Sequence, residues 1–453
     1  MNILTLFGER IAEFAVTVPS KGHKRFYIDA FLNIYGCLLG GIKKNIIDVL
    51  AGFYNQDAVG TGRYHPIGRR ELMSIASCVA VDALSMADLA YDDIQYGTTL
   101  HPAGPVAAAI LGLARRMPIS GIQAIQAFQV GMEVECRMAV CMLGEKAGAE
   151  KGWFPTGITG GIGAASACGY LFGFNKEQMQ TAQALAAVRA CGNRGTHGSN
   201  AAMLVHAIAA ESGYTAAALT ANGFNCSPSA LTGENGLIRQ LAHTPNVEEA
   251  LAGLGEVYVC ESTSCKPYQY GFIAFAVIDC CEQLNRIIRE CGRQPAKLTA
   301  FVSPDVYLLG REPDPQVVEA AAVSLKYLIQ MAVLTPEYIY RELGTHFYPR
   351  EYANGGLEVE LVQDLQMTDE QARLYIEFTD TSTCEVFCSE APGSPKNPMS
   401  TQMVKEKFLR LAMSRLEERD AVRLMTRLEN IDEENTIKFL IQKWSSGKFD
   451  HHI

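Results

Sequence analysis

Long helical segments rich in Ala, Gly and Ser constrain the fold of this chain more than any other feature. Apolar residues recur at helical spacing through residues 1–260, and no alternation of strands with helices is visible there. In "TGGIGAASACGYLFG" and "AAMLVHAIAAESGYTAAALTANGF" the side chains are so small that the helices must pack very closely. This half of the chain therefore predicts a helical domain and not a doubly wound parallel sheet.

The residue pattern changes near residue 257. The stretches "EVYVCEST", "KLTAFVSPDVYLL", "EVELVQD" and "ARLYIEFTDTSTCEVFCSE" are β-branched and aromatic, and helical stretches lie between them. Such a mixture is typical of an α+β domain. The connector "APGSPKNPM" precedes a return to helix, with Ser400 or Thr401 as the N-cap. We expect a mostly α protein with an all-helical domain (1–260 and 395–453) and a smaller α+β domain (261–394).

Charge and composition argue against several classes of partner. The formal net charge of −10 disfavours nucleic acid and acidic membranes. The longest apolar runs, such as "FIAFAVI", are far shorter than the ~18–20 residues needed to span a bilayer. The first residues form an amphipathic helix pattern and not a signal peptide. The fourteen cysteines show no metal-ligand spacing, which indicates reduced thiols and a cytoplasmic protein.

Nucleotide and metal cofactors are also not expected. The glycine run "TGITGGIG" lacks the Lys-Ser/Thr pair of a phosphate loop and follows no predicted strand, so close helix packing explains it better. No set of His and Cys residues has the spacing of a metal site.

The segment "AYDDIQYGTTLHPAG" (90–104) interrupts the helices with titratable groups. Adjacent side chains point in different directions, so at most one of Asp92 and Asp93 enters a site. We assign that role to Asp93 and expect the other to cap or pair structurally. His101 lies just before a predicted helix, whose N-terminus favours an anionic ligand. The alternative is a histidine that only satisfies loop carbonyl groups.

A second polar segment, "GNRGTHGSN" (192–200), combines three glycines with polar side chains. Arg194 can hold a carboxylate bidentately. His197 can act as a general base near neutral pH, and Asn200 can contact the substrate. An ordinary polar loop between two helices is the alternative.

A third candidate segment lies where the two predicted domains meet. Lys266 can hold a carboxylate, and Tyr268 and Tyr270 can donate hydrogen bonds or, for Tyr268, a proton. Clefts between domains are preferred ligand sites. Packing at the domain junction is the alternative, because tyrosine commonly buries its ring.

Six segments occur in the order seen in the MmgE/PrpD family, which this chain resembles over nearly its whole length. They are "YDDIQYGTTLHPAG", "GWFPTGITGGIGAASACGYLFGF", "AAESGYTAAALTANGFNCSPSALTGENG", "CKPYQYGFIAFAVID", "VSLKYLIQMAVL" and "APGSPKNPMSTQMVKEKF". The family contains 2-methylcitrate dehydratase, cis-aconitate decarboxylase and iminodisuccinate epimerase. The resemblance implies a helical domain built from both termini, a smaller α+β lid domain, usually a homodimer, and neither metal nor organic cofactor.

The resemblance keeps only part of the family's site. Asp92, Asp93 and His101 match the family's DD and HP positions, and Lys266 with Tyr268 matches its KPY motif. Other family positions are substituted. The resemblance implies an aspartate at Ala90, a histidine at Phe154 and a lysine at Ala202. It also implies a cysteine and a histidine, whose positions fall on Gly271, Phe272 or Phe275. The phenylalanines suggest a substrate less polar than citrate.

These patterns predict a cofactor-independent lyase for a small carboxylate substrate, which abstracts a proton next to a carboxylate or carbonyl. An epimerase or isomerase using the same proton abstraction is one alternative, and a non-catalytic binding or assembly protein is another. The expected catalytic residues converge on one interdomain cleft; they are His101, Asp93, Lys266, Tyr268 and His197. The expected substrate-binding residues are Arg194, Thr156, Asn200 and Tyr270.

Overall fold

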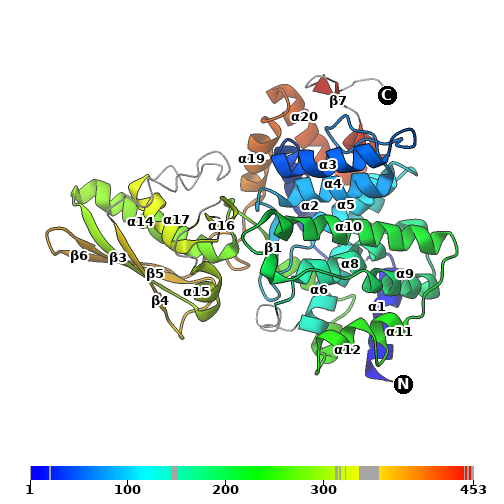
Figure 1. The fold of residues 1–453 in the computed structure, drawn as a ribbon, viewed down its shortest axis with the longest axis horizontal. Coiled ribbons are helices and arrows are strands. Elements are labelled where there is room, and N and C mark those ends of the chain that lie inside the picture. The colour runs from blue at the N-terminus through cyan, green and yellow to red at the C-terminus, as the bar shows by residue number, and fades with distance from the viewer. Residues whose placement is uncertain are drawn as a thin grey trace. The chain divides into compact units, whose positions relative to one another are not determined.

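The chain forms two compact units in a computed structural model. The model describes residues 2–19, 22–143, 152–311, 315, 318–321, 323–335, 357–442, 444–445 and 448–449. The helical unit comprises residues 1–195, 201–265 and 400–453, and the mixed unit comprises residues 196–200 and 266–399. Helices dominate the first, and a four-stranded sheet with helices makes up the second (Figure 1). The predicted fold class, mostly α with a smaller α+β part, is confirmed.

Both ends of the chain contribute helices to the helical unit. They are α1 (Ile3–Ala15), α2 (Lys24–Gly41), α3 (Asn45–Asp57), α4 (Ile75–Ala87), α5 (Ala103–Ala114), α6 (Gly121–Leu143), α8 (Pro155–Phe172), α9 (Lys176–Val188), α10 (Asn200–Ala221), α11 (Ser229–Thr232), α12 (Leu237–Leu241), α13 (Val247–Leu251), α19 (Thr401–Ala412) and α20 (Glu418–Glu429). Short 3₁₀ turns include η1 (Arg194–Thr196) and η2 (Val259–Ser262).

Helix α4 is shorter than its sequence pattern predicts. The small, apolar residues of "RRELMSIASCVAVDALSMADLA" (69–90) predict one long helix, but α4 begins at Ile75. The Ser74 side chain accepts a hydrogen bond from the Ser77 amide and so fixes the N-terminus there. Helix α19 is capped in the same way by Ser400, one of the two predicted caps.

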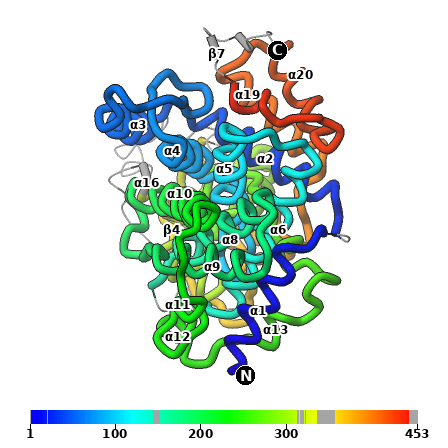
Figure 2. Tube along the Cα trace, turned by 90° about the vertical axis from the view of Figure 1, so that its right-hand side faces the viewer, coloured from blue at the N-terminus to red at the C-terminus, as the bar shows by residue number. Residues whose placement is uncertain are grey.

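Small residues let the central helices approach closely, as their composition predicts. Helices α5, α6 and α9 all pack against α8 (Figures 1 and 2). A methyl group placed on Gly163 of α8 would lie only 2.7 Å from Cβ of Glu135 in α6. A methyl group on Gly213 of α10 would lie 2.4 Å from Cβ of Ala164. No larger side chain fits at these crossings without movement of the helices.

A two-stranded antiparallel pair lies within the helical unit. Strand β1 (Asp93–Gln95) pairs with β2 (Thr263–Cys265), with Asp93 opposite Cys265. The strand expected over "EVYVCEST" is therefore mostly wrong, since residues 259–262 form η2 and β2 starts only at Thr263. This pair fixes the segment between α4 and α5 that carries the candidate site.

The mixed unit is built on a sheet with strand order β4-β3-β5-β6. Strand β3 (Pro295–Val302) runs parallel to β4 (Glu358–Gln363) and antiparallel to β5 (Ala372–Phe378). Strands β5 and β6 (Thr383–Cys388) form a hairpin, which explains their alternating sequence pattern. The helices of this unit are α14 (Phe275–Cys291), α15 (Pro304–Gly310), α16 (Val318–Ala321) and α17 (Leu325–Leu334), preceded by η3 (Phe272–Ala274). Helices α14 and α17 pack on the sheet (Figure 1).

The predicted strand "KLTAFVSPDVYLL" is wrong in its second half. Strand β3 ends at Val302, and the Ser303 side chain accepts a hydrogen bond from the Val306 amide at the start of α15. Pro304 then occupies the first turn of the helix, where its missing N–H costs nothing.

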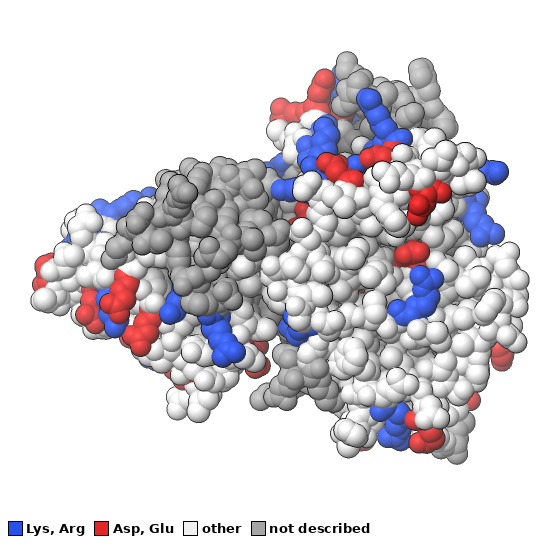
Figure 3. Space-filling model, viewed as in Figure 1, with Lys and Arg blue, Asp and Glu red and all other residues white. Residues whose placement is uncertain are grey.

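Acidic and basic side chains are interspersed on the face of the helical unit seen in Figure 3. Among the described residues, we find no helix with the length and apolar character needed to cross a membrane. The fourteen cysteines are free thiols, and most of them are buried.

Candidate active site

The backbone that leads into β1 is held from two helices. The Tyr91 carbonyl accepts hydrogen bonds from Lys407 Nζ in α19 (2.6 Å) and from Cys37 Sγ in α2 (3.0 Å). Asn33 Nδ2 donates to the Asp92 carbonyl at 3.0 Å. The Lys407 ammonium also lies 3.7 Å from the centroid of the Tyr91 ring. Buried contacts to both ends of the chain therefore fix the position of Asp92.

The His101 ring is oriented by acceptors on one side. Its Nδ1 lies 2.6 Å from the Asp93 carbonyl oxygen and 3.2 Å from Oδ2 of Asp92. Because both neighbours are acceptors, Nδ1 carries the hydrogen, and Nε2 of the neutral ring holds the lone pair. The His101 amide donates to Oγ1 of Thr156 in α8 at 3.1 Å. The ring is thus prepared to accept a proton at Nε2.

The two adjacent aspartates divide their roles. The Asp92 carboxylate lies 3.2 Å from Nδ1 of His101. A carboxylate oxygen of Asp93, to which we gave the catalytic role, lies within 4.8 Å of a nitrogen of His101. The Asp93 carboxylate accepts a hydrogen bond from the Ala103 amide at 3.1 Å, in the first turn of α5. Both side chains are almost wholly buried. The Asp93 carboxylate thus lies at a helix N-terminus, where a negative charge is favoured.

A second histidine, which the sequence reasoning missed, lies beside His101. The rings of His101 and His206 have centroids 5.4 Å apart, and the Phe154 ring lies 5.9 Å from His206. Phe154 packs with Ala202 and Val205 in a small apolar cluster. His206 is buried in α10, in a run whose apolar pattern resembles an ordinary helix core. A buried histidine within such a run is the signal that could have identified it.

The loop between β1 and His101 is strained and is held by Arg194. Thr99 has φ of 55°, a left-handed conformation that a β-branched residue rarely adopts. Its hydroxyl accepts a hydrogen bond from the Arg194 guanidinium at 2.7 Å. Arg194 also donates to the Trp153 carbonyl at 3.2 Å. Arg194 therefore reaches the segment that carries His101, and backbone strain of this kind is typical of functional sites.

Three predicted site residues follow β2 in the chain. Lys266 is the residue after Cys265, whose Cα pairs with that of Asp93. The Tyr268 ring lies 5.9 Å from the Phe275 ring in the mixed unit. Tyr270 is 1% exposed, and its hydroxyl makes no hydrogen bond within the described part of the chain. Burial raises the pKa of Tyr270. Its predicted contact with a substrate stays a prediction.

His197 and Asn200 belong to the mixed unit. Their convergence with His101, like that of Lys266 and Tyr268, stays a prediction. Within the helical unit, the residues brought together are His101, Asp92, Asp93, Thr156 and Arg194 with its hydrogen-bond partner Thr99.

Asp92, Asp93 and His101 also have the composition of a metal site. One potential ligand atom from each lies within 4.8 Å of the others, the single group of three that we find in the described residues. His101 Nδ1, however, donates a hydrogen bond to the Asp93 carbonyl here, so a cation bound at that atom would have to displace its proton. The geometry is that of a hydrogen-bonded acid–base cluster.

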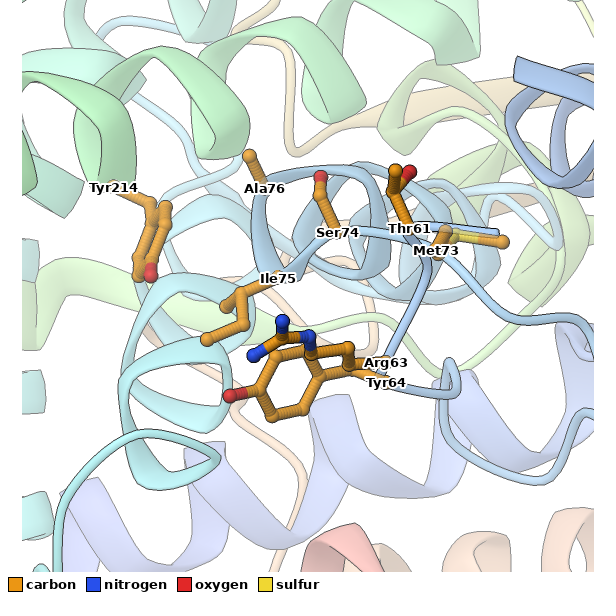
Figure 4. Close-up of a pocket in the computed structure, with 8 residues that line it drawn as sticks. All are labelled: Thr61, Arg63, Tyr64, Met73, Ser74, Ile75, Ala76 and Tyr214. Carbon is orange, nitrogen blue, oxygen red and sulfur yellow. The ribbon is translucent and has the colours of Figure 1, made fainter. Parts of the chain in front are cut away.

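A separate cavity in the helical unit contains none of the predicted residues. Its volume is about 360 Å³. Figure 4 shows the described residues that line it, namely Thr61, Arg63, Tyr64, Met73, Ser74, Ile75, Ala76 and Tyr214. These lining residues include no histidine and no carboxylate, so we do not place the candidate active site there.

The chain combines a helical unit that carries this cluster with an inserted unit built on a mixed sheet. Two family models match successive parts of the chain. The model of the MmgE/PrpD N-terminal domain matches residues 9–250, and that of the MmgE/PrpD C-terminal domain matches residues 268–432. The chain belongs to the MmgE/PrpD family, as the order of its motifs predicts.

Two relatives carry the name cis-aconitate decarboxylase. The chain is 23% identical over 402 residues to that of Aspergillus terreus, across 78% of this chain and 79% of the relative. A second, from Aspergillus terreus strain NIH 2624 / FGSC A1156, is 24% identical over 245 residues, or 50% of each chain.

Proposed function

We propose that this protein is a lyase that moves a proton next to a carboxylate or carbonyl of a small carboxylate substrate. The orientation of His101 is the observation that carries the proposal. Nδ1 donates to the Asp93 carbonyl and faces the Asp92 carboxylate, which leaves Nε2 as the base. Family membership and the decarboxylase relatives support the same reaction class.

The proposed proton transfer starts at His101. Nε2 takes the proton from the substrate carbon, and the Asp92 carboxylate stabilises the positive ring that results. In a dehydration the adjacent C–O bond then breaks, and the leaving hydroxide is protonated to water. A decarboxylation needs no such abstraction: the C–C bond breaks, CO₂ leaves, and the electron pair that stays on the carbon takes up a proton. His206 can return that proton from within the helical unit, alongside the predicted Tyr268 and His197.

The substrate carboxylates need cations or amide donors. Arg194 is anchored on the loop that precedes His101, and Lys266 follows β2 directly. We propose both as carboxylate ligands, with Thr156 and Asn200 as polar contacts. Phe154 and Ala202 occupy family positions that hold polar groups, which supports a substrate less polar than citrate.

Solvent-exchange NMR tests the proposal directly. Small di- and tricarboxylates are incubated with the enzyme in D₂O, and deuterium incorporation and new products are followed by proton NMR. We expect exchange next to a carboxylate together with alkene formation or CO₂ release. His101→Asn should lower the rate by about 10²–10⁴-fold, as loss of a general base does. His243→Asn changes an exposed histidine of the same unit and serves as the control.

The outcomes separate the alternatives. Exchange with inversion and no loss of CO₂ or water would favour an epimerase. Binding of carboxylates without exchange would favour the non-catalytic protein. An unchanged rate in His101→Asn would remove His101 from the proton transfer.

A further inference from the structure

A second buried carboxyl group lies at the same helix N-terminus as Asp93. Glu135 of α6 is 0% exposed, and neither of its oxygens makes a hydrogen bond within the residues that the structure describes. A methyl group placed on Gly160 of α8 would lie 3.2 Å from Oε1 of Glu135 and 3.3 Å from Pro105 in the first turn of α5. Asp93 accepts its hydrogen bond from Ala103 in that turn. Two carboxyl groups therefore gather at one place.

The surroundings of the two carboxyl groups differ, so that one favours the ionised form and the other favours the protonated form. Asp93 accepts an amide hydrogen bond at a helix N-terminus, which stabilises the anion. Gly160 and Gly163 of α8 lie against Glu135, with Pro105 of α5 close to Gly160, and no described residue gives the Glu135 oxygens a hydrogen bond. Burial, and then the charge of Asp93, raises the pKa of Glu135 well above its usual value.

The remaining titratable groups on α6 do not offset the burial of Glu135 either. Cys136 follows it, and its thiol pKa is raised by burial and by Glu133, Glu135 and Asp93. Glu133 is paired with Arg137 one turn along the helix, with their charged atoms 2.5 Å apart.

We propose that Glu135 is the neutral carboxylic acid of this site, retaining its proton while Asp93 carries the charge, and that it acts as a positioning residue through Asp93. A third anion beside Asp92 and Asp93 would repel a carboxylate substrate. A neutral Glu135 leaves only the two negative charges of Asp92 and Asp93 in the cluster. The catalytic consequence rests on the function proposed above, whereas the protonation state can be measured without a substrate.

The pH dependence of stability tests the protonation state. Above the ordinary carboxyl pKa of about 4.3, the unfolded chain releases the proton and the folded chain keeps it. The wild-type folded state therefore loses stability as pH rises, until Glu135 itself ionises. In Glu135→Gln the side chain keeps the shape of a protonated glutamate, but it has no acidic proton to release on unfolding. Its ratio of folded to unfolded protein, relative to wild type, should rise by up to tenfold for each pH unit above about 4.5.

Glu133→Gln is the matched control, two residues away on the same helix. Glu133 is ion-paired with Arg137 and accepts hydrogen bonds from the amides of Val259 and Cys260. We expect this substitution to lower the melting temperature, while Glu135→Gln leaves it unchanged or raises it at neutral pH. Equal destabilisation by both, or a Glu135→Gln curve parallel to that of wild type, would overturn the proposal.

Infrared spectroscopy decides the question should Glu135→Gln fail to fold. Wild-type protein with isotope-labelled glutamate should show a protonated carboxyl band at neutral pH, and its absence would refute a neutral Glu135.

In the folded variant, kcat should persist at alkaline pH where wild-type kcat falls. If the band is present, but kcat of Glu135→Gln and of wild type falls in the same way at alkaline pH, the positioning role is wrong. If no substrate turns over, the proposed function fails, and the band still decides the protonation state.

Discussion

Asp92→Asn isolates the electrostatic contribution of one carboxylate to the proposed proton transfer. Nδ1 of His101 stays fixed, because the Asp93 carbonyl at 2.6 Å still accepts its hydrogen. What is lost is the negative charge 3.2 Å from Nδ1. With an effective dielectric constant of about 20, two unit charges at that distance attract by about 5 kcal/mol. If half of the positive charge has developed in the transition state, the barrier rises by about 2.5 kcal/mol, or roughly 70-fold in rate.

The assay is turnover of the substrate identified by solvent exchange, with kcat and KM measured separately. We expect the loss in kcat, because the ring becomes positive only during the reaction. Asp82→Asn is the control, since Asp82 is a buried aspartate whose partner is Arg115, with the charged atoms 2.7 Å apart. It should lower stability and leave turnover per folded molecule unchanged. A folded Asp92→Asn protein with less than threefold loss in kcat would refute this reasoning.

Two further predictions concern the packing around the site. Arg137→Met should lower the free energy of unfolding by about 3–5 kcal/mol in urea titrations, because it leaves the charge of Glu133 buried without its partner; a loss below about 1 kcal/mol would contradict it. Gly163→Ala should cost about 1–3 kcal/mol, since its methyl group would lie 2.7 Å from Cβ of Glu135. Gly52→Ala is the contrast, because α3 leaves open space there and removal of a mid-helix glycine should stabilise by about 0.5–1 kcal/mol. Equal stability of the two alanine variants would show that α6 and α8 do not approach so closely.

The fold was largely predictable because its signals are local. The pattern over residues 121–143 predicts α6 with its observed bounds, and Ser400 caps α19 as expected. The errors arose where two signals compete. The stretch "SPDVYLL" is rich in strand-forming residues, yet Ser303 and Pro304 start a helix there. The pairing of β1 with β2 joins residues 168 or more positions apart, and no local pattern specifies such a partner.

The candidate site was less predictable because side-chain direction depends on packing. The sequence predicts that at most one of Asp92 and Asp93 enters a site, whereas a carboxylate oxygen of each lies within 4.8 Å of a nitrogen of His101. The catalytic role of Asp93 stays a prediction. His206 and Glu135 were missed for a different reason. Both lie in segments whose pattern is that of a buried helix, and the roles proposed for them depend on neighbours from other segments.

The substituted family positions have a physical explanation in the helical unit. Phe154, at a position where the resemblance implies a histidine, packs with Ala202, at a position where it implies a lysine. The two substitutions are therefore neighbours, and a lysine at 202 would bring a charge into an apolar cluster that now includes Val205. The Phe154 ring instead contacts His206, and His206 contacts His101. An imidazole thus remains beside His101 although the family position has lost it. The partly buried His101 ring and the buried His206 ring thus lie side by side, as the proton transfer proposed above requires of a base and an acid.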